Sequence, residues 1–170
     1  MSDKTKKILL IVSGVMTAVI CLIMNIILIP KIEASTGGIR CFDMNFAYSY
    51  DVAKSFLGSI SEEGRRIYLT RQLPLDFVYP VFYTMFFVLA LQKLTYNKKA
   101  VCILPVLLAA ADYTENICTV IMLKSASLSP ALAAFASAVT AAKTVLMYVI
   151  ILIIIVLFVK RIIKNKKKKA

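Results

Sequence analysis

Long apolar segments alternate with shorter polar intervals along this chain. Four such segments cover about residues 8–30, 73–94, 100–123 and 131–159. Each reaches the ~20 apolar residues that a helix needs to cross roughly 30 Å of hydrocarbon. A helix satisfies its own backbone hydrogen bonds, so it is the form in which one such segment can span a bilayer. The pattern predicts an all-α fold, a four-helix transmembrane bundle that forms a single membrane domain over residues 1–170.

The longest polar interval, residues 31–72, connects the first two spans and carries helix signals of its own. Ser49 and Ser61 stand where a serine can cap the start of a helix. Apolar residues at every fourth position from 52 to 60 follow the first serine, and two glutamates follow the second. This interval therefore predicts a pair of short helices that lie on one end of the bundle.

The composition is typical of a protein with a lipid-facing surface. Hydrophobic residues make up 60% of the chain and the mean hydropathy is +0.81, more than a soluble domain of this size can hide. Histidine is absent from the sequence, which excludes imidazole chemistry and the usual zinc sites. The four cysteines include no C-x-x-C pair, which argues against a thiol oxidoreductase and a disulfide framework. We expect neither a metal nor a cofactor.

The distribution of charge predicts how the helices are oriented. The net charge is +12, from 21 basic and 9 acidic residues. Most of the basic residues precede the first span or lie in the turn at 93–99 and the tail at 160–170, whereas acids nearly balance bases in residues 31–72. This distribution predicts a multi-pass protein of the cell membrane. By the positive-inside rule, both of its termini lie on the cytoplasmic side. We expect the tail to contact anionic lipid head groups, and we expect no nucleic-acid partner.

Ionisable residues interrupt the apolar spans at one depth. A charge within a span costs about 2.5–3.5 kcal/mol, so it seldom occurs there without a role. There are four of them: three acids in the second and third spans and a lysine in the fourth. With a rise of ~1.5 Å per residue, all four fall in the outer half of the bundle, although their helices run in opposite directions. Asn25 and Asn116 fall in the same zone. Tyr79 and Tyr83 share a helix face with Asp76, the first of the acids in the spans. The sequence predicts a ligand-binding site made of these asparagines and tyrosines together with Asp76, Asp112, Glu115 and Lys143.

Two interpretations of this cluster remain open. In one, Lys143 pairs with Asp112 or Glu115 and only holds helices together, through polar contacts worth about 0.6 kcal/mol on average. In the other, the excess of three acids over one lysine marks a binding pocket that opens to the outside. We favour the pocket because an unpaired carboxylate is costly at this depth.

Several segments resemble one group of proteins. These segments are G-R-x-x-Y at 64–68, L-P-L-D-F-V-Y-P at 73–80 and D-x-x-E-N at 112–116. The chain resembles an uncharacterised family of small bacterial four-span membrane proteins from about residue 42 to residue 123. The resemblance implies a shared fold and a shared site on Asp76, Asp112, Glu115 and Asn116, and it implies no particular activity.

We expect the pocket to bind or transport a small cationic or amphipathic ligand, such as an amine or a lipid, because surplus carboxylates and tyrosine rings suit ammonium groups. A transport path through so small a chain would need a homodimer. One alternative is an intramembrane lipid-modifying enzyme, in which the outer interval forms a lid and Arg65, Arg66 and Arg71 hold a phosphate. Another is a structural or accessory subunit. We favour a non-enzymatic role, because no nucleophile elbow or phosphate loop is present.

Overall fold

The computed structural model describes residues 2–95 and 99–167, and this part of the chain is all-α. Two of its long helices are interrupted by π-helical turns: α1 (Asp3–Leu22) continues through Ile23–Leu28 into α2 (Ile29–Ala34), and α4 (Glu62–Ile67) continues through Tyr68–Gln72 into α5 (Leu73–Leu94). The other two long helices are α6 (Ile103–Lys124) and α7 (Pro130–Lys167). All four are long and apolar enough to cross a membrane. The predicted all-α four-helix bundle is confirmed, and the chain is a multi-pass membrane protein.

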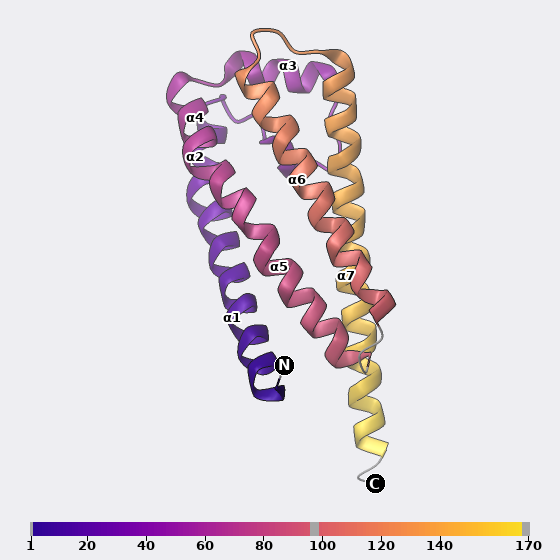
Figure 1. The fold of residues 1–170 in the computed structure, drawn as a ribbon. Coiled ribbons are helices and arrows are strands. Elements are labelled where there is room, and N and C mark those ends of the chain that lie inside the picture. The colour runs from indigo at the N-terminus through magenta and orange to yellow at the C-terminus, as the bar shows by residue number, and fades with distance from the viewer. Residues whose placement is uncertain (1, 96–98, 168–170) are drawn as a thin grey trace.

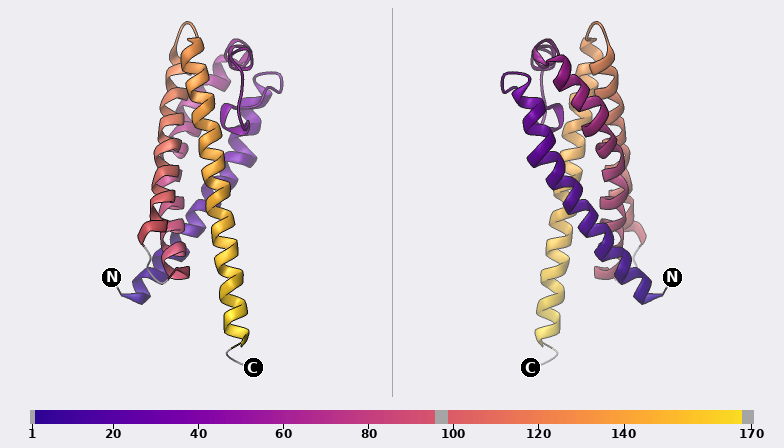
Figure 2. Two further views of the ribbon diagram at one scale, coloured as in Figure 1. Left: turned by 90° about the vertical axis from the view of Figure 1, so that its right-hand side faces the viewer. Right: turned by 90° about the vertical axis from the view of Figure 1, so that its left-hand side faces the viewer.

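Neighbouring helices of the bundle run in alternating directions (Figure 1). Helix α1 packs against α5, α5 against α6, and α6 against α7. The N-terminus and the end of α7 both lie at one end of the bundle, and the short helix α3 (Tyr50–Ser59) lies across the opposite end. Figure 2 shows that α1 runs obliquely to α7.

Two prolines explain where the π-helical turns occur. Pro30 and Pro74 each lie in the first turn of the helical segment that follows a π-helical turn. Proline has no N–H, so the carbonyl groups of Ile26 and Thr70 lack their usual partner four residues later. The backbone widens just before each proline, and such π-bulges are frequent at functional sites.

Both predicted helix caps are present in the segment between the first two spans. The Ser49 hydroxyl accepts a hydrogen bond from the N–H of Val52 at the start of α3. The Ser61 hydroxyl accepts one from the N–H of Gly64 at the start of α4. The four-residue apolar spacing predicts only part of the buried face of α3, because Phe56 is buried whereas Val52 is exposed.

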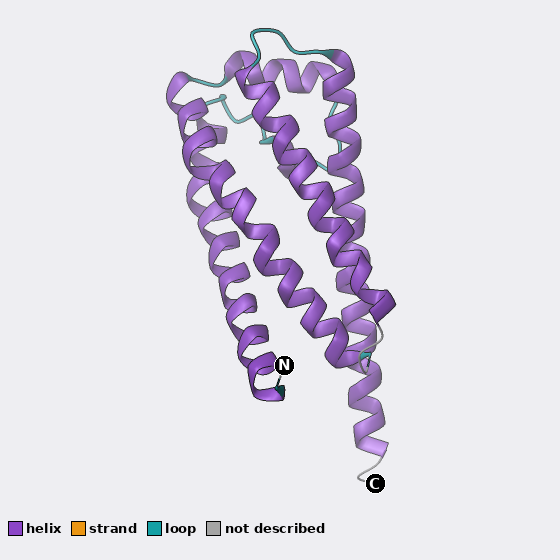
Figure 3. Ribbon diagram, in the orientation of Figure 1, coloured by secondary structure: helices purple, strands orange, loops and turns teal. Residues whose placement is uncertain are grey.

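The segment before α3 folds back into the end of the bundle, where the loops are concentrated (Figure 3). A single 3₁₀ turn, Phe42–Met44, lies in its path. The Phe42 ring packs between the rings of Tyr48 and Phe56, at centroid distances of 5.2 Å and 4.7 Å. The N–H of Tyr48 donates to the Ser137 hydroxyl of α7 at 2.8 Å, which fastens the segment to the bundle.

The last helix extends beyond the predicted span. Helix α7 runs to Lys167, so most of the basic tail predicted at 160–170 continues the helix. Residues 168–170, and residues 96–98 of the predicted basic turn, lie outside the described part of the chain.

Candidate functional site

A cavity of about 220 Å³ lies in the same part of the bundle as the predicted polar cluster. Its wall is formed by the π-helical turn of the first helix, by α5, α6 and α7, and by the loop residues Asp43 and Met44. Three carboxyl groups, those of Asp43, Asp76 and Asp112, line it together with the Lys143 amine. Acidic side chains from α5, α6 and the loop thus face the same cavity.

Lys143 lies at the centre of the polar cluster. Its Nζ forms ion pairs with a carboxylate oxygen of Glu115 and, at 3.5 Å, with Oδ1 of Asp112. The second oxygen of Glu115 accepts a hydrogen bond from the Thr140 hydroxyl at 2.5 Å. The Glu115 side chain is only 2% exposed, so this acid is held between α6 and α7 by two partners on α7.

Asp112 and Asp76 connect α6 with α5. The Tyr83 hydroxyl of α5 donates to Oδ2 of Asp112 at 2.9 Å. The Asn116 side-chain amide of α6 donates to the backbone carbonyl of Asp76 at 3.0 Å. The Asp76 carboxylate itself accepts a hydrogen bond from Gln72 Nε2 at 3.1 Å, from the π-helical turn before α5. These contacts give the cluster a role in helix packing.

Asp43 differs from the other acids because it comes from the loop. Its Oδ1 is buried and accepts no hydrogen bond from the part of the chain that the structure describes. Burial raises the pKa of Asp43 to about 6, with Glu115 and Asp112 adding to the rise and the positive charge of Lys143 opposing it. An acid with this pKa is mostly charged at neutral pH and becomes neutral under mildly acidic conditions. The cavity therefore has one wall that carries a carboxyl group with one buried oxygen that accepts no hydrogen bond from the described residues.

The structure brings together most of the residues predicted from the spans. Tyr79 lines the cavity, and its ring lies 5.0 Å from that of Tyr83. Asn25 also lines it, although its amide is used within its own helix, where it donates to the carbonyl of Cys21 at 2.9 Å. Glu115 and Asn116 lie behind the wall, where each supports a lining residue.

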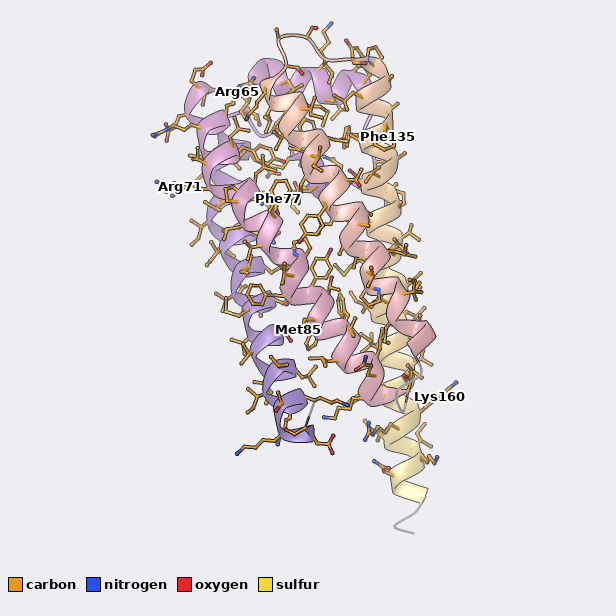
Figure 4. All side chains as sticks on the ribbon, viewed as in Figure 1. Arg65, Arg71, Phe77, Met85, Phe135 and Lys160 are labelled. Atoms are coloured by element: carbon orange, nitrogen blue, oxygen red, sulfur yellow. The ribbon has the colours of Figure 1, made fainter. Side chains whose placement is uncertain are left out.

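The three arginines predicted for a lid do not line the cavity. Arg65 donates to the backbone carbonyl groups of Leu123 and Leu57, and thus ties α4 to the neighbouring elements. Arg66 pairs with Glu63 on the same exposed face of α4. Figure 4 shows Arg71 projecting away from the bundle. In this arrangement Asp43 and Met44, rather than the arginine-bearing helix, are the loop residues that reach the cavity.

Three residues that take part in the cluster were absent from the predicted set: Asp43, Gln72 and Thr140. Gln72 precedes a span by one residue, and its four-residue spacing from Asp76 is a signal that could have indicated the contact. Thr140 lies three residues before Lys143, on the buried face of α7 that also carries Ala136 and Ser137. Asp43 carries no periodic signal, because it belongs to a loop.

The polar groups of the site contain more acids than bases. Four carboxyl groups surround one lysine here, so the site has an excess of negative charge unless protons or a cation balance it. Within the described residues no three acidic or thiol side chains come together as metal ligands. The described carboxyl groups therefore do not converge on one point as a set of metal ligands.

Comparisons with known proteins add no further assignment. No protein-family model, curated protein or solved structure matches this chain. The resemblance to small four-span membrane proteins therefore stays a prediction.

Proposed function

We propose that the cavity binds a small organic cation, a protonated amine or quaternary ammonium, as a receptor site or as one station on a transport path. The observation that carries this proposal is the Asp43 carboxyl group. It is buried at the cavity, its Oδ1 has no donor among the described residues, and it adds a fourth acid to a site with one lysine. A protonated amine would supply the missing donor, and either kind of cation would balance the charge.

The other groups on the wall suit such a ligand. Asp76 offers a second carboxylate on α5, and the Tyr79 ring offers an aromatic face. A cation held against a ring face gains about 0.5–1 kcal/mol at an exposed site and about 2 kcal/mol when water is excluded. Met24 and Met147 complete the wall with adaptable apolar surface for the ligand's carbon atoms. Lys143 already pairs with Glu115 and Asp112 and so balances part of the negative charge of the site.

The orientation is part of the same proposal. The charge bias of the sequence favours a cytoplasmic position for both chain ends, which lie together at one end of the bundle (Figure 1). The cavity includes loop residues from the opposite end. In the cell membrane the cavity would then face the outer side, and its ligand would enter from there.

A binding experiment with matched probes tests the proposal. The full chain in mild detergent is titrated with tetramethylammonium, with butylamine and with the neutral butanol, and the midpoint of thermal unfolding is recorded. The two cations should raise the midpoint and butanol should not, because a ligand that binds only the folded state stabilises it. Asp43→Asn and Asp76→Asn should each weaken the effect of the cations.

Asp51 provides the control, since it is an exposed acid of α3 that does not line the cavity. Asp51→Asn removes the same charge and should leave the response to both cations intact. Equal responses to the cations and to butanol would show that charge plays no part. Equal losses in Asp43→Asn and Asp51→Asn would place the cation elsewhere.

A further inference from the structure

A second cavity, of about 510 Å³, lies at the end of the bundle that carries the two chain ends. Residues from three helices line it: α1 provides Lys6 and Lys7, α5 provides Lys93, and α7 provides Arg161. Among the described residues of its wall, Asp3 is the one acid and four side chains are positive. This cavity is therefore mainly basic, whereas the first cavity is mainly acidic.

One of the cationic groups is held in place. The Arg161 guanidinium donates to the backbone carbonyl of Lys93 at 2.8 Å, which joins α7 to the end of α5. A guanidinium fixed in this way has further N–H groups that can bind two oxygen atoms of a phosphate side by side. The lysines of α1 add point charges from the other side of the cavity. The geometry suits an anionic oxygen ligand of the phosphate class.

The rest of the wall indicates where that phosphate comes from. Leu10 lies one helical turn deeper than Lys6, and Leu89 lies one turn deeper than Lys93. On the surface beside them, Ile11 of α1 is 55% exposed and Phe158 of α7 is 56% exposed. Positive charge at the helix ends and apolar surface just below them match the layering of a phospholipid, with its head group in the interface and its chains in the hydrocarbon.

We infer that this basic cavity is a binding site for the phosphate of an anionic phospholipid, which holds α1 against α5 and α7 at this end of the bundle. The site is distinct from general attraction of the basic tail to the membrane surface, because it depends on side chains that face one cavity. Basic pockets between transmembrane helices bind anionic head groups by the same physics.

Native mass spectrometry of the full chain in mild detergent tests the inference. Phosphatidylglycerol and phosphatidylcholine with the same acyl chains are added at matched concentrations. We expect phosphatidylglycerol to bind in preference. Arg161→Gln should weaken its binding about fivefold, the loss expected for one basic group near an anionic head group. Arg161→Lys should recover part of that loss, because the charge returns without the planar fork.

Lys160 is the matched control. It neighbours Arg161 on the same helix but is exposed and does not line the cavity, and Figure 4 shows it projecting from the outer side of α7. Lys160→Gln should change the binding of phosphatidylglycerol clearly less than Arg161→Gln does. Circular dichroism of each variant checks that the helices are retained, and Arg161→Lys carries the test if Arg161→Gln fails to fold.

Three results would overturn the inference. Equal binding of phosphatidylcholine would remove the role of the anionic head group. Equal effects of Lys160→Gln and Arg161→Gln would show that only overall charge matters. Inorganic phosphate alone is the third arm: if it raises the midpoint of unfolding as strongly as phosphatidylglycerol at the same free concentration, the cavity takes a soluble phosphate rather than a lipid.

Discussion

Replacing Lys143 with methionine tests whether charge holds the centre of the bundle together. The Lys143 amine pairs with Glu115 and lies 3.5 Å from Oδ1 of Asp112. The exposed fractions of these side chains are 18%, 2% and 9%, so solvent screens the pairs only slightly. Removing one partner of a buried ion pair costs about 3–5 kcal/mol, since the other charge stays buried. We expect Lys143→Met to lower the free energy of unfolding by about this amount.

A double-mutant cycle with Glu115 isolates the pair. Glu115→Gln leaves Lys143 with Asp112, and the glutamine oxygen can still accept from Thr140. That variant should therefore cost less than Lys143→Met, about 1.5–3 kcal/mol for one charged hydrogen bond. Lys143→Met with Glu115→Gln should cost less than the sum of the two, by a coupling energy of about 1–3 kcal/mol. Unfolding in mixed micelles with added dodecyl sulfate, followed by circular dichroism, gives these free energies.

Lys160→Met serves as the reference, because it removes an exposed lysine of the same helix. The reasoning is wrong if Lys143→Met destabilises the protein no more than Lys160→Met does. It is also wrong if the coupling energy does not exceed ~0.6 kcal/mol, the average for interhelical polar contacts in membranes.

Three further predictions follow from other parts of the structure. Gly64→Ala should destabilise the protein by about 1–3 kcal/mol in chemical unfolding, because a Cβ at this position would overlap the Ser35 side chain. An unchanged midpoint of chemical unfolding would refute this contact. Asp43→Asn should stabilise the ligand-free protein above pH ~6 and make little difference below the ordinary carboxyl pKa of 3.8. Burial raises the folded-state pKa of Asp43 to about 6, so charging this acid costs stability only as the pH rises. A change in stability that does not depend on pH would contradict this prediction. With the other cysteines replaced by serine, Cys21 on the cavity wall should react with a water-soluble maleimide, and tetramethylammonium should slow the reaction; labelling that the cation leaves unchanged would separate the thiol from the binding site.

The pairing of Asp112, Glu115 and Lys143 was largely predictable from the sequence. The two acids share one helix face by their three-residue spacing, and the lysine falls at a similar depth on a helix of opposite direction. In a hydrocarbon environment such groups have few other partners, so depth and phase nearly decide the contact. The partner of Asp76 was less evident, because Gln72 lies just before the predicted span, although its four-residue spacing from Asp76 is the ordinary helical one.

The sequence by itself determined the number of spans, the all-α fold and the two serine caps at Ser49 and Ser61, since each of these depends on residues close together in the chain. Only the tertiary structure decided that Asp43 reaches the cavity, that Arg65 turns to backbone carbonyl groups, and that Lys6 and Arg161 face one space. A loop has no period that fixes which side its residues face. Its path depends on contacts such as that between Tyr48 and Ser137, 89 residues apart, which no local pattern encodes.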